Sequence, residues 1–216
     1  MNPLNPVEVR VLGSLVEKDI TTPEYYPLTL NALTNACNQS SNRDPVVALS
    51  EQDVVRGLDS LREKKMAFMF QGAESRVPKY GHRLAETLEL ARPATAIMCV
   101  LMLRGSQTAG EIRGRTGRMH EFASLEEVVA ALDALVARSP KPLVARLPRR
   151  AGLKEQRYAH LLAGDVSPAA PDPGPAVAAA PPGDERLARL EAESASLRAE
   201  VAELRGQLAD LRKQLE

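Results

Sequence analysis

A twelve-residue segment that occurs twice constrains the fold of this chain most. Residues 50–61 read SEQDVVRGLDSL, and residues 124–135, 74 positions later, read SLEEVVAALDAL, with six of the twelve positions identical. In each copy two valines and two leucines recur at i, i+1, i+4 and i+7, which places them on one face of a helix. The match predicts an internal duplication and therefore two domains of similar construction.

The residues around each copy extend the repeat. Each copy begins with a serine followed three positions later by an acid, which predicts a capped helix start, and only the second copy is a Ser-x-x-Glu box. Two short apolar strand patterns, separated by a loop that contains glycine, follow each copy. These strands are expected at residues 66–70 and 76–80, and again at residues 143–147 and 156–161. The order helix, helix, capped helix, hairpin predicts a winged helix-turn-helix.

The remaining elements fit the same order. Pro6 suits the first turn of a helix, and Thr108 suits a helix cap. Further helices are expected at residues 6–18, 29–37, 81–90, 94–103 and 109–116. We therefore predict a mainly α-helical protein with small β-hairpin wings, in which two tandem winged helix-turn-helix domains cover residues 1–91 and 92–164.

Two segments of contrasting composition follow. Residues 165–183 contain six prolines and two glycines in 19 positions and are expected to be an extended linker. Residues 184–216 carry apolar side chains at alternating spacings of three and four, which predicts a C-terminal coiled-coil helix with one polar position at Ser194. The predicted dimerisation residues are Leu187, Leu190, Leu197, Val201, Leu204, Leu208, Leu211 and Leu215.

Charged positions beside these leucines favour a parallel dimer. With Leu187 at position a, Glu193 faces Arg198 of a second chain, and Glu200 faces Arg205. A single amphipathic helix folded back on its own domains is the alternative, and the long linker and the strict period of 3.5 argue against it. The helix is near the lower length limit for an independent coiled coil, so concentration-dependent dimerisation is expected.

The composition of the chain indicates where in the cell the protein is located. No apolar run approaches the roughly 20 residues that cross a bilayer, and the first residues lack a basic segment followed by an apolar one. The two cysteines, Cys37 and Cys99, fall in predicted helices of different domains, as reduced and buried thiols would. We therefore expect a cytoplasmic protein that does not bind membranes.

Zero net charge conceals an uneven distribution. Residues 92–164 carry 12 basic and 6 acidic residues, whereas residues 1–91 carry 10 and 12, and residues 165–216 carry 6 and 10. An anionic partner is therefore expected to bind the middle domain. The residues predicted to hold DNA phosphates lie on its second helix and its wing, and they are Arg113, Arg115, Arg118, Arg146, Arg149, Arg150, Lys154 and Arg157.

The third helices are less suited to reading bases. Away from its apolar face the second copy presents Glu126 and Asp133, which phosphates repel, and alanines that offer a thymine methyl contact at most. The first copy offers Gln52 and Arg56 among several acids. A solvated helix face is the alternative interpretation of these residues, and strong sequence-specific readout is not expected.

A polar loop at residues 38–45 (NQSSNRDP) is longer than a helix-turn-helix requires. Its Asn, Ser and Asp side chains favour local hydrogen bonds to the backbone, so a structured turn is one interpretation. A binding loop is the other. In that case the candidate binding residues are Asn38, Gln39, Asn42, Arg43 and Asp44.

Catalytic and metal-binding patterns are missing from the sequence. The histidines His82, His120 and His160 are scattered, and two of them follow Tyr80 and Tyr158 at equivalent places, which indicates packing. No cysteine pair, His-Glu-x-x-His motif or phosphate-binding loop is present. We therefore expect no enzyme activity, no metal ion and no cofactor.

Five blocks of sequence resemble the YceH-like family of uncharacterised bacterial proteins, which are built as tandem winged-helix domains. The blocks are TPEYYPLTLNAL (22–33), CNQSSNRDPV (37–46), VPKYGHRL (77–84), RGSQTAGEIRGRTGRMHEF (104–122) and LPRRAGLKEQRYAHLL (147–162). The resemblance covers residues 3–163 and leaves out the linker and the coiled coil. Ser40 and Ala109 depart from it, where lysine and proline are expected. It implies the architecture and a nucleic-acid-binding function, and it supplies no catalytic residue or ligand.

Two functions from different classes remain. The first is a regulatory DNA-binding protein that holds double-stranded DNA mainly through the wing and second helix of the middle domain, and that dimerises through its C-terminal helix. The second is an adaptor whose third helices bind partner proteins. Small residues on the second copy, Ala130, Ala131, Ala134 and Ala137, would allow another helix to approach closely.

Overall fold

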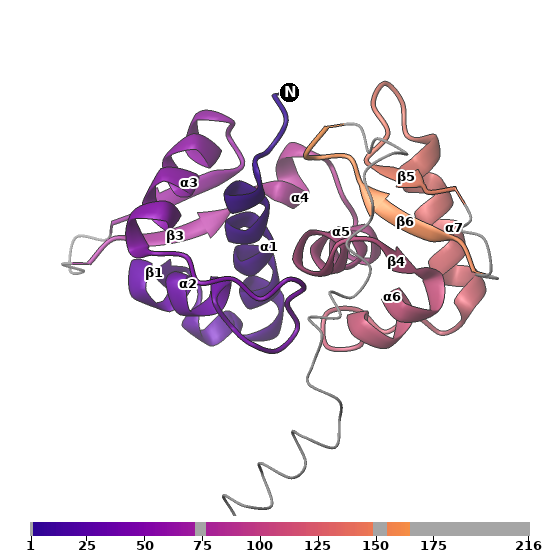
Figure 1. Cartoon of the computed structure of the whole chain (residues 1–216), viewed down its shortest axis with the longest axis horizontal. Helices are drawn as coiled ribbons and strands as arrows, with labels where there is room; N and C mark the ends of the chain where they lie inside the picture. Colours follow the sequence, from indigo (N-terminus) through magenta and orange to yellow (C-terminus); the bar gives the residue numbers. More distant parts are fainter. Residues whose placement is uncertain (1, 72–76, 149–154, 165–216) are drawn as a thin grey trace, which may run out of the picture. The chain divides into compact units, whose positions relative to one another are not determined.

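The computed structural model describes residues 2–71, 77–148 and 155–164. Within these ranges the chain is mainly α-helical, with seven α-helices and two three-stranded antiparallel sheets (Figure 1). The prediction of a mainly helical protein with small β-hairpins is confirmed for this part of the chain.

The first half, up to residue 91, begins with its longest helix, α1 (Pro6–Thr21). Asn5 caps this helix, because its side-chain oxygen accepts from the Glu8 N–H at 2.9 Å while Glu8 accepts from the Asn5 N–H at 2.7 Å. The reciprocal pair satisfies two backbone donors, and Pro6 needs no partner at its position. The elements that follow are η1 (Pro23–Tyr25), β1 (Leu28–Thr29), α2 (Leu30–Cys37), α3 (Glu51–Glu63), β2 (Ala67–Phe70), β3 (Lys79–His82) and α4 (Leu84–Thr87).

The second half repeats this order from residue 92. Its elements are α5 (Arg92–Arg104), β4 (Gln107–Thr108), α6 (Ala109–Thr116), α7 (Leu125–Ala137), β5 (Val144–Arg146) and β6 (Arg157–His160). Thr108 caps α6, and Glu111 accepts from the Thr108 N–H at 2.8 Å in return. Each half thus contains a helix, a short strand, two helices and a hairpin.

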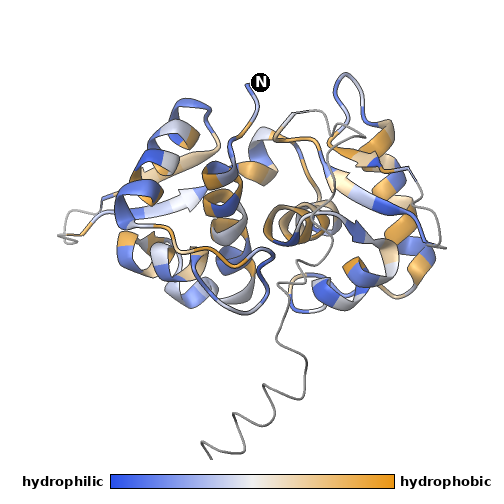
Figure 2. Ribbon diagram, in the orientation of Figure 1, coloured by the Kyte–Doolittle hydropathy of each residue, from blue (hydrophilic) through white to orange (hydrophobic). Residues whose placement is uncertain are grey.

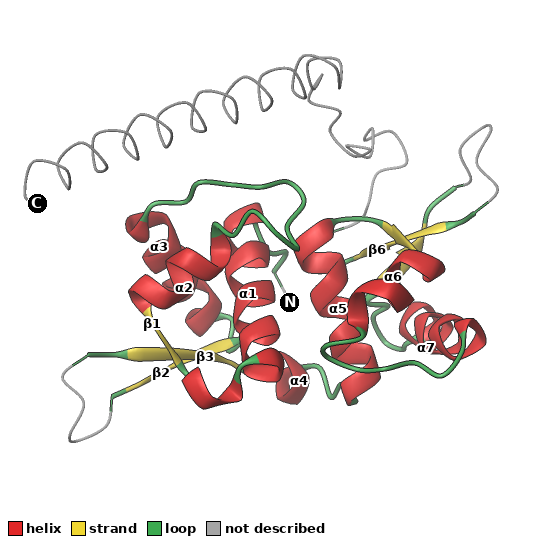
Figure 3. Ribbon diagram, turned by 90° about the horizontal axis from the view of Figure 1, so that it is seen from below, coloured by secondary structure: helices red, strands yellow, loops and turns green. Residues whose placement is uncertain are grey.

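The two sheets share a topology and a register (Figure 3). In the first sheet, with strand order β1-β3-β2, Tyr80 pairs with Leu28. In the second, with order β4-β6-β5, Tyr158 pairs with Gln107. The histidines two residues after these tyrosines each pair with the first residue of the outer hairpin strand. The repeat in the sequence therefore extends to the pairing of the strands.

The repeated segments form α3 and α7, and their apolar faces point into the protein as predicted. The first valine and both leucines of each copy are buried, and the second valine is half-buried. Figure 2 shows the apolar sides of the helices turned inward. Burying each such side chain contributes about 1.5–3 kcal/mol, so these faces hold the third helices in place.

The caps of these two helices differ from the prediction. Ser50 accepts from the Asp53 N–H and Asp53 accepts from the Ser50 N–H at 3.0 Å, so the first copy has a complete capping box. Ser124 accepts from the Glu127 N–H at 3.3 Å, but the Glu127 carboxylate accepts from the Ala123 N–H at 2.8 Å instead. The prediction that the acid reaches back to the capping serine is therefore confirmed for the first copy and wrong for the second.

The first helices of the two halves, α1 and α5, pack against each other at the centre of the described chain (Figures 1 and 3). Gly13 allows this close contact, since a Cβ at that position would lie 2.9 Å from Cδ2 of Leu103. Buried apolar side chains from both halves form one cluster around the contact. The described halves therefore share a core.

Two features of the sheets differ from the sequence prediction. β1 and β4 have two residues each, which is too short for an alternating pattern to reveal them. Gly81 and His82 belong to β3, and the predicted helix at 81–90 is reduced to α4. The Tyr26 hydroxyl accepts from the His82 N–H at 2.6 Å, and a Cβ on Gly81 would overlap the ring of Phe68. Tertiary contacts thus keep these residues in the strand.

Both cysteines are buried free thiols, Cys37 on α2 and Cys99 on α5, as predicted. Burial raises the pKa of each thiol. Neither is therefore expected to act as a reactive thiolate.

The predicted linker at residues 165–183 and the predicted coiled coil at residues 184–216 lie outside the described residues, together with the leucines assigned to dimerisation. In the described ranges no helix combines the length and the apolar character needed to span a bilayer.

Candidate nucleic-acid interface

Three of the predicted phosphate contacts lie on or beside α6, and two of them reach the surface. Arg113 is exposed, and its Nη2 donates to the Ala123 carbonyl at 2.9 Å, which ties α6 to the loop before α7. Arg118, just beyond the end of α6, is exposed as well. Arg115 is half-buried.

Arg115 and Arg157 flank the same carboxylate, that of Glu111. Glu111 and Arg115 are four residues apart on α6 and so share a helix face. Arg157 of β6 forms an ion pair with Glu111 at 3.3 Å and donates to the Ser106 carbonyl at 2.5 Å. Burial lowers the pKa of Arg115, and the neighbouring charge of Arg104 lowers it further. These two predicted contacts are therefore half-buried cations.

Arg146 is exposed on β5, but a carboxylate already accompanies it. Its guanidinium pairs with Asp133 of α7, and this hydrogen bond and charge raise the pKa of Arg146. The acid comes from the third helix, so the helix partly neutralises the strand beside it. A phosphate at Arg146 would have to compete with Asp133.

The other predicted contacts are divided between the two halves. Arg149, Arg150 and Lys154 lie outside the described residues. In the first half, Gln52 and Arg56 are exposed on α3, and Arg56 pairs with Asp53 one turn earlier. Among the predicted contacts that the structure describes, four arginines are exposed: Arg56, Arg113, Arg118 and Arg146. Arg115 and Arg157 are half-buried beside Glu111.

The outward face of α7 offers little to a base edge. Ala130, Ala134 and Ala137 are exposed along it, and Leu125 at its start is 42% exposed. Its first turn is acidic. This face fits a close-packed helix or solvent better than a hydrogen-bonded base.

The loop at residues 38–45 is tied to the first half by its side chains. Asn38 donates to the Leu49 carbonyl and accepts from the Leu49 N–H, each at 2.8 Å. Arg43, only 4% exposed, pairs with Glu17 of α1 at 2.6 Å and donates to the Ala36 carbonyl at 2.7 Å. These contacts account for the length of the loop.

The same loop also reaches the second half. The Asp44 N–H donates to the Leu103 carbonyl at 2.9 Å, and the Asn42 side-chain oxygen accepts from Arg104 Nη1 at 3.3 Å. Asn42 has a φ of 56°, in the left-handed region that asparagine tolerates. Gln39 accepts from Arg43 at 3.2 Å. The contacts fit the interpretation as a structured turn, and ligand binding by the loop stays a prediction.

The histidines sit in packed surroundings. His82 Nδ1 accepts from a backbone N–H at 3.1 Å and its Nε2 lies 3.2 Å from Asp19, so both ring nitrogens are occupied. Burial lowers the pKa of His160, at the equivalent place in β6, to about 4. His120 packs edge-on against Phe122. Among the described residues no cluster of His, Cys, Asp or Glu could hold a metal ion.

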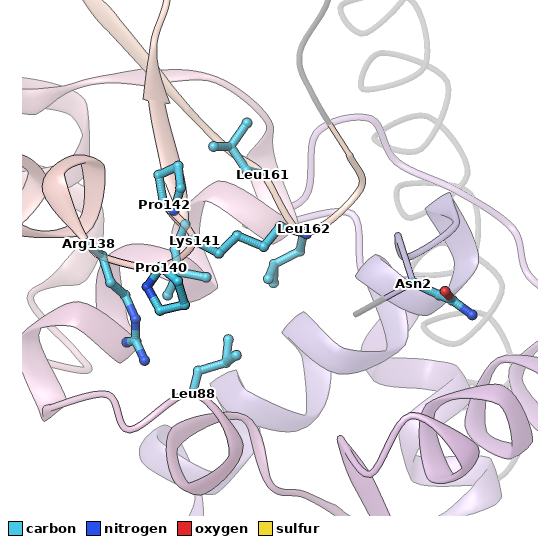
Figure 4. Close-up of a pocket in the computed structure, with 9 residues that line it drawn as sticks. Asn2, Leu88, Arg138, Pro140, Lys141, Pro142, Leu161 and Leu162 are labelled. Carbon is cyan, nitrogen blue, oxygen red and sulfur yellow. The ribbon is translucent and has the colours of Figure 1, made fainter.

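A small cavity of about 190 Å³ lies near the end of β6 (Figure 4). Its wall is largely apolar, with Leu88, Pro140, Pro142 and Leu162 among the lining residues. The described residues that line it include two cations but no carboxylate, histidine or cysteine. The cavity therefore offers no acid–base pair.

Sequence reasoning missed Arg104, whose Nη1 joins the loop to the second half. A single arginine at the end of an apolar helix carries no sequence signal of such a role. Only packing brings it beside Arg115.

These features define a class of mainly helical proteins with two similar halves, each holding a three-stranded sheet, and with excess positive charge in the second half. The chain belongs to the family described as "Protein of unknown function, DUF480", whose model matches residues 4–153.

Curated relatives agree with this assignment. A UPF0502 protein of Opitutus terrae is 58% identical over 192 residues, which is 89% of this chain and 82% of that protein. A UPF0502 protein of Geotalea uraniireducens is 54% identical over 196 residues, covering 89% of each chain, and one of Geobacter sulfurreducens is 54% identical over 202 residues with the same coverage. The predicted membership of an uncharacterised bacterial family is confirmed under the names DUF480 and UPF0502.

Proposed function

We propose that this protein is a cytoplasmic, regulatory DNA-binding protein built from two tandem winged helix-turn-helix domains, residues 1–91 and 92–164. Residues 165–183 would link them to a coiled coil at residues 184–216 that joins two copies in parallel. The observation that carries the proposal is the repetition of three helices and a hairpin, with one strand register, in both halves.

In this arrangement α3 and α7 are the helices that face the major groove, and the hairpins β2-β3 and β5-β6 are the wings. The second domain supplies the charge. Arg113 and Arg118 are exposed beside α6, and Arg146 is exposed on β5. Contacts to phosphates position a protein on the duplex without reading its sequence. The alanines and acids on the outside of α7 argue for weak base readout.

Fluorescence anisotropy with a DNA duplex across a salt series tests the proposal. If six cations neutralise phosphates, the log-log salt slope should be about −5. The double variant Arg113→Gln/Arg118→Gln should bring the slope about 2 units closer to zero, because each phosphate contact contributes about 0.9. Arg83→Gln, an exposed arginine of the first half outside the predicted contacts, is the matched control.

Two outcomes would contradict DNA binding. The first is no binding to any duplex at low salt. The second is unchanged affinity in a variant with Arg149, Arg150 and Lys154 all replaced by glutamate.

A specific observation supports a second candidate, a protein-interaction adaptor. Met69 and Phe70, adjacent on β2, are 42% and 52% exposed, and Leu125 is exposed beside the alanines of α7. Neighbouring apolar side chains on a surface often mark a protein contact. An adaptor would use the third helices for partner proteins, and their acids would then do no harm.

Co-purification of a stoichiometric protein partner tests this candidate. Ala134→Glu should weaken the complex at least about tenfold, since a charge would enter a close helix contact. Ala123→Glu, exposed just before α7, should leave it intact. Elution of the protein alone at the size of a monomer would count against the adaptor.

A further inference from the structure

Two guanidinium groups of the second half hold buried N–H donors that have no acceptor. Nε of Arg104 and Nη1 of Arg115 are inaccessible to solvent and form no hydrogen bond in the part of the chain that is described. Buried donors in native proteins are nearly always paired, because an unpaired donor loses water and gains no partner. The cost is larger when the group is charged. These two atoms mark a place that suits an acceptor.

Three elements bring cations to this place. Arg104 ends α5, Arg115 lies on α6 and Arg157 lies on β6. Arg157 pairs with Glu111 at 3.3 Å, and Glu111 is one turn before Arg115, so both arginines adjoin the same side of α6. Arg157 also donates to the Ser106 carbonyl at 2.5 Å, two residues after Arg104, and the pKa of Arg115 is lowered by burial and by the charge of Arg104. The three guanidiniums therefore form one cluster.

The nearby carboxylates do not satisfy these donors. Glu111 already accepts from the Thr108 N–H at 2.8 Å and from Arg157. Asp44 attracts Arg115 through its charge, but the two form no ion pair among the described residues. An anionic ligand would supply the acceptors that these buried donors lack in the described part of the chain.

A third atom narrows the chemistry of that ligand. Gln107 Oε1 is buried without a donor, while its amide nitrogen donates to the Arg104 carbonyl at 2.9 Å. The cluster therefore offers two N–H donors, from α5 and α6, and one acceptor, from β4. An oxyanion that also carries an O–H matches this set, as hydrogen phosphate does, whereas a phosphate monoester loses its O–H above a pKa of about 6.

We propose that Arg104, Arg115 and Gln107 form a phosphate-binding site in the second half, with Asn42 holding Arg104 in place from the first half. Guanidinium groups favour phosphate because their parallel N–H donors match its oxygens. The site goes beyond the proposed DNA contacts. A DNA phosphodiester has no O–H to give Gln107, so free hydrogen phosphate fits better than the DNA backbone.

Thermal unfolding of the full chain with inorganic phosphate, at constant ionic strength in chloride, tests the site without DNA. At about ten times Kd, phosphate should raise the Tm of the wild type by about 4 °C. Arg115→Gln and Arg104→Gln should each weaken binding at least about tenfold, as measured by calorimetric titration. Arg118→Gln removes an exposed arginine beside the same helix and should keep the full response.

A second readout keeps the test informative if a variant folds poorly. Without phosphate, Arg115→Gln should unfold at the same or a higher temperature than the wild type, because it removes a buried Nη1 donor that has no acceptor among the described residues. A wild type that does not respond to phosphate and a response retained by Arg115→Gln would each overturn a free-phosphate site.

Measuring the binding of a DNA duplex as well distinguishes free phosphate from the phosphates of the DNA backbone. If free phosphate fills the site, Arg115→Gln loses the phosphate response and keeps its affinity for a duplex. If a phosphate of the DNA backbone fills the site, inorganic phosphate does not change the Tm. Arg115→Gln then weakens duplex binding about tenfold, whereas Arg83→Gln does not. No effect of Arg115→Gln in either arm sinks the site, and it leaves the proposed DNA contacts of Arg113 and Arg118 to their own test.

Discussion

The buried N–H groups of arginines are hydrogen-bonded differently in the two halves of the molecule. In the first half, Arg43 is almost fully buried and its guanidinium pairs with Glu17 and donates to the Ala36 carbonyl. Arg10, also buried, donates to the carbonyls of Cys37, at the end of α2, and of Pro45 in the loop that follows. In the second half, Arg104 and Arg115 each keep a buried N–H without an acceptor among the described residues.

The equivalent histidines show the same contrast. His82 in the first sheet has partners for both ring nitrogens, whereas His160 in the second is half-buried and its Nδ1 has no partner among the described residues. The two halves therefore repeat the backbone fold but not its polar contacts. In the first half the buried arginines hold the loop and α1 together. In the second half, buried polar atoms of Arg104, Arg115 and His160 have no partner among the described residues and could bind a ligand or a proton.

Removing Arg43 should have the largest effect on stability. Arg43→Ala leaves Glu17 buried without its partner, which should cost about 3–5 kcal/mol in the free energy of unfolding measured with urea. The matched control is Arg62→Ala, whose exposed pair with Asp59 should contribute less than about 1 kcal/mol. Equal losses of unfolding free energy in the two variants would contradict the conclusion that the buried pair of Arg43 and Glu17 stabilises the first half.

The pH dependence of this loss follows from Glu17. Burial opposes ionisation of Glu17, but the hydrogen bonds and charge of Arg43 outweigh it and lower its pKa. The stability from this carboxylate is therefore present above the unfolded pKa of 4.5 and is lost as pH falls through the folded pKa. The difference in unfolding free energy between Arg43→Ala and the wild type should accordingly persist down to about pH 4.5 and shrink below it, as Glu17 takes up a proton.

The contact shared by the halves should be the next most sensitive. Gly13→Val places side-chain atoms where a Cβ alone would approach Leu103 to 2.9 Å, so α1 and α5 must separate. Overpacking of this kind should cost about 3 kcal/mol, measured by thermal unfolding. Gly114→Val is the control for a β-branched residue in a helix, because a Cβ there meets no other atom. Similar losses in both would contradict a tight contact at Gly13.

His160 should make the second half sensitive to mild acid. Its folded pKa of about 4 lies below the unfolded value of 6.5, so the unfolded chain takes up the proton first and stability falls as pH drops below 6.5. Between pH 7.5 and pH 5 the loss should be about 2 kcal/mol. His160→Leu should remove most of this pH dependence in urea titrations, and a variant that retains it would refute the assignment.

The smallest expected difference concerns the caps of the third helices. Ser50→Ala breaks a complete capping box and should cost about 1 kcal/mol. Ser124→Ala breaks one side-chain contact, at 3.3 Å, and should cost about 0.5 kcal/mol. Urea unfolding of both variants measures the difference. A larger loss for Ser124→Ala would contradict the stronger cap of the first copy.

Local patterns predicted much of the fold. The apolar faces of α3 and α7, the cap at Thr108 and the hairpins all follow from spacing and from turn residues. The two-residue strands β1 and β4 were missed, because their pairing partners lie about 50 residues away. Gly81 and His82 were assigned to a helix, because the local sequence does not reveal Tyr26 and Phe68 as their neighbours.

The candidate site was predictable in its residue types but not in its geometry. Excess charge pointed to the second half, and Arg113 and Arg118 are exposed there. Burial of Arg115 and the pairing of Arg146 with Asp133 depend on how strands and helices cross, which residue types do not encode singly.

By itself the sequence determined the repeat, the helical class and the half that carries the positive charge, because helix periodicity and charge counts are local properties of a chain. Only the tertiary structure decided that the halves share a core through α1 and α5, that Arg43 is held inside, and that Arg104 lies beside Arg115. Those outcomes depend on which side chains are brought together and deprived of water, and that is settled by packing across the whole fold.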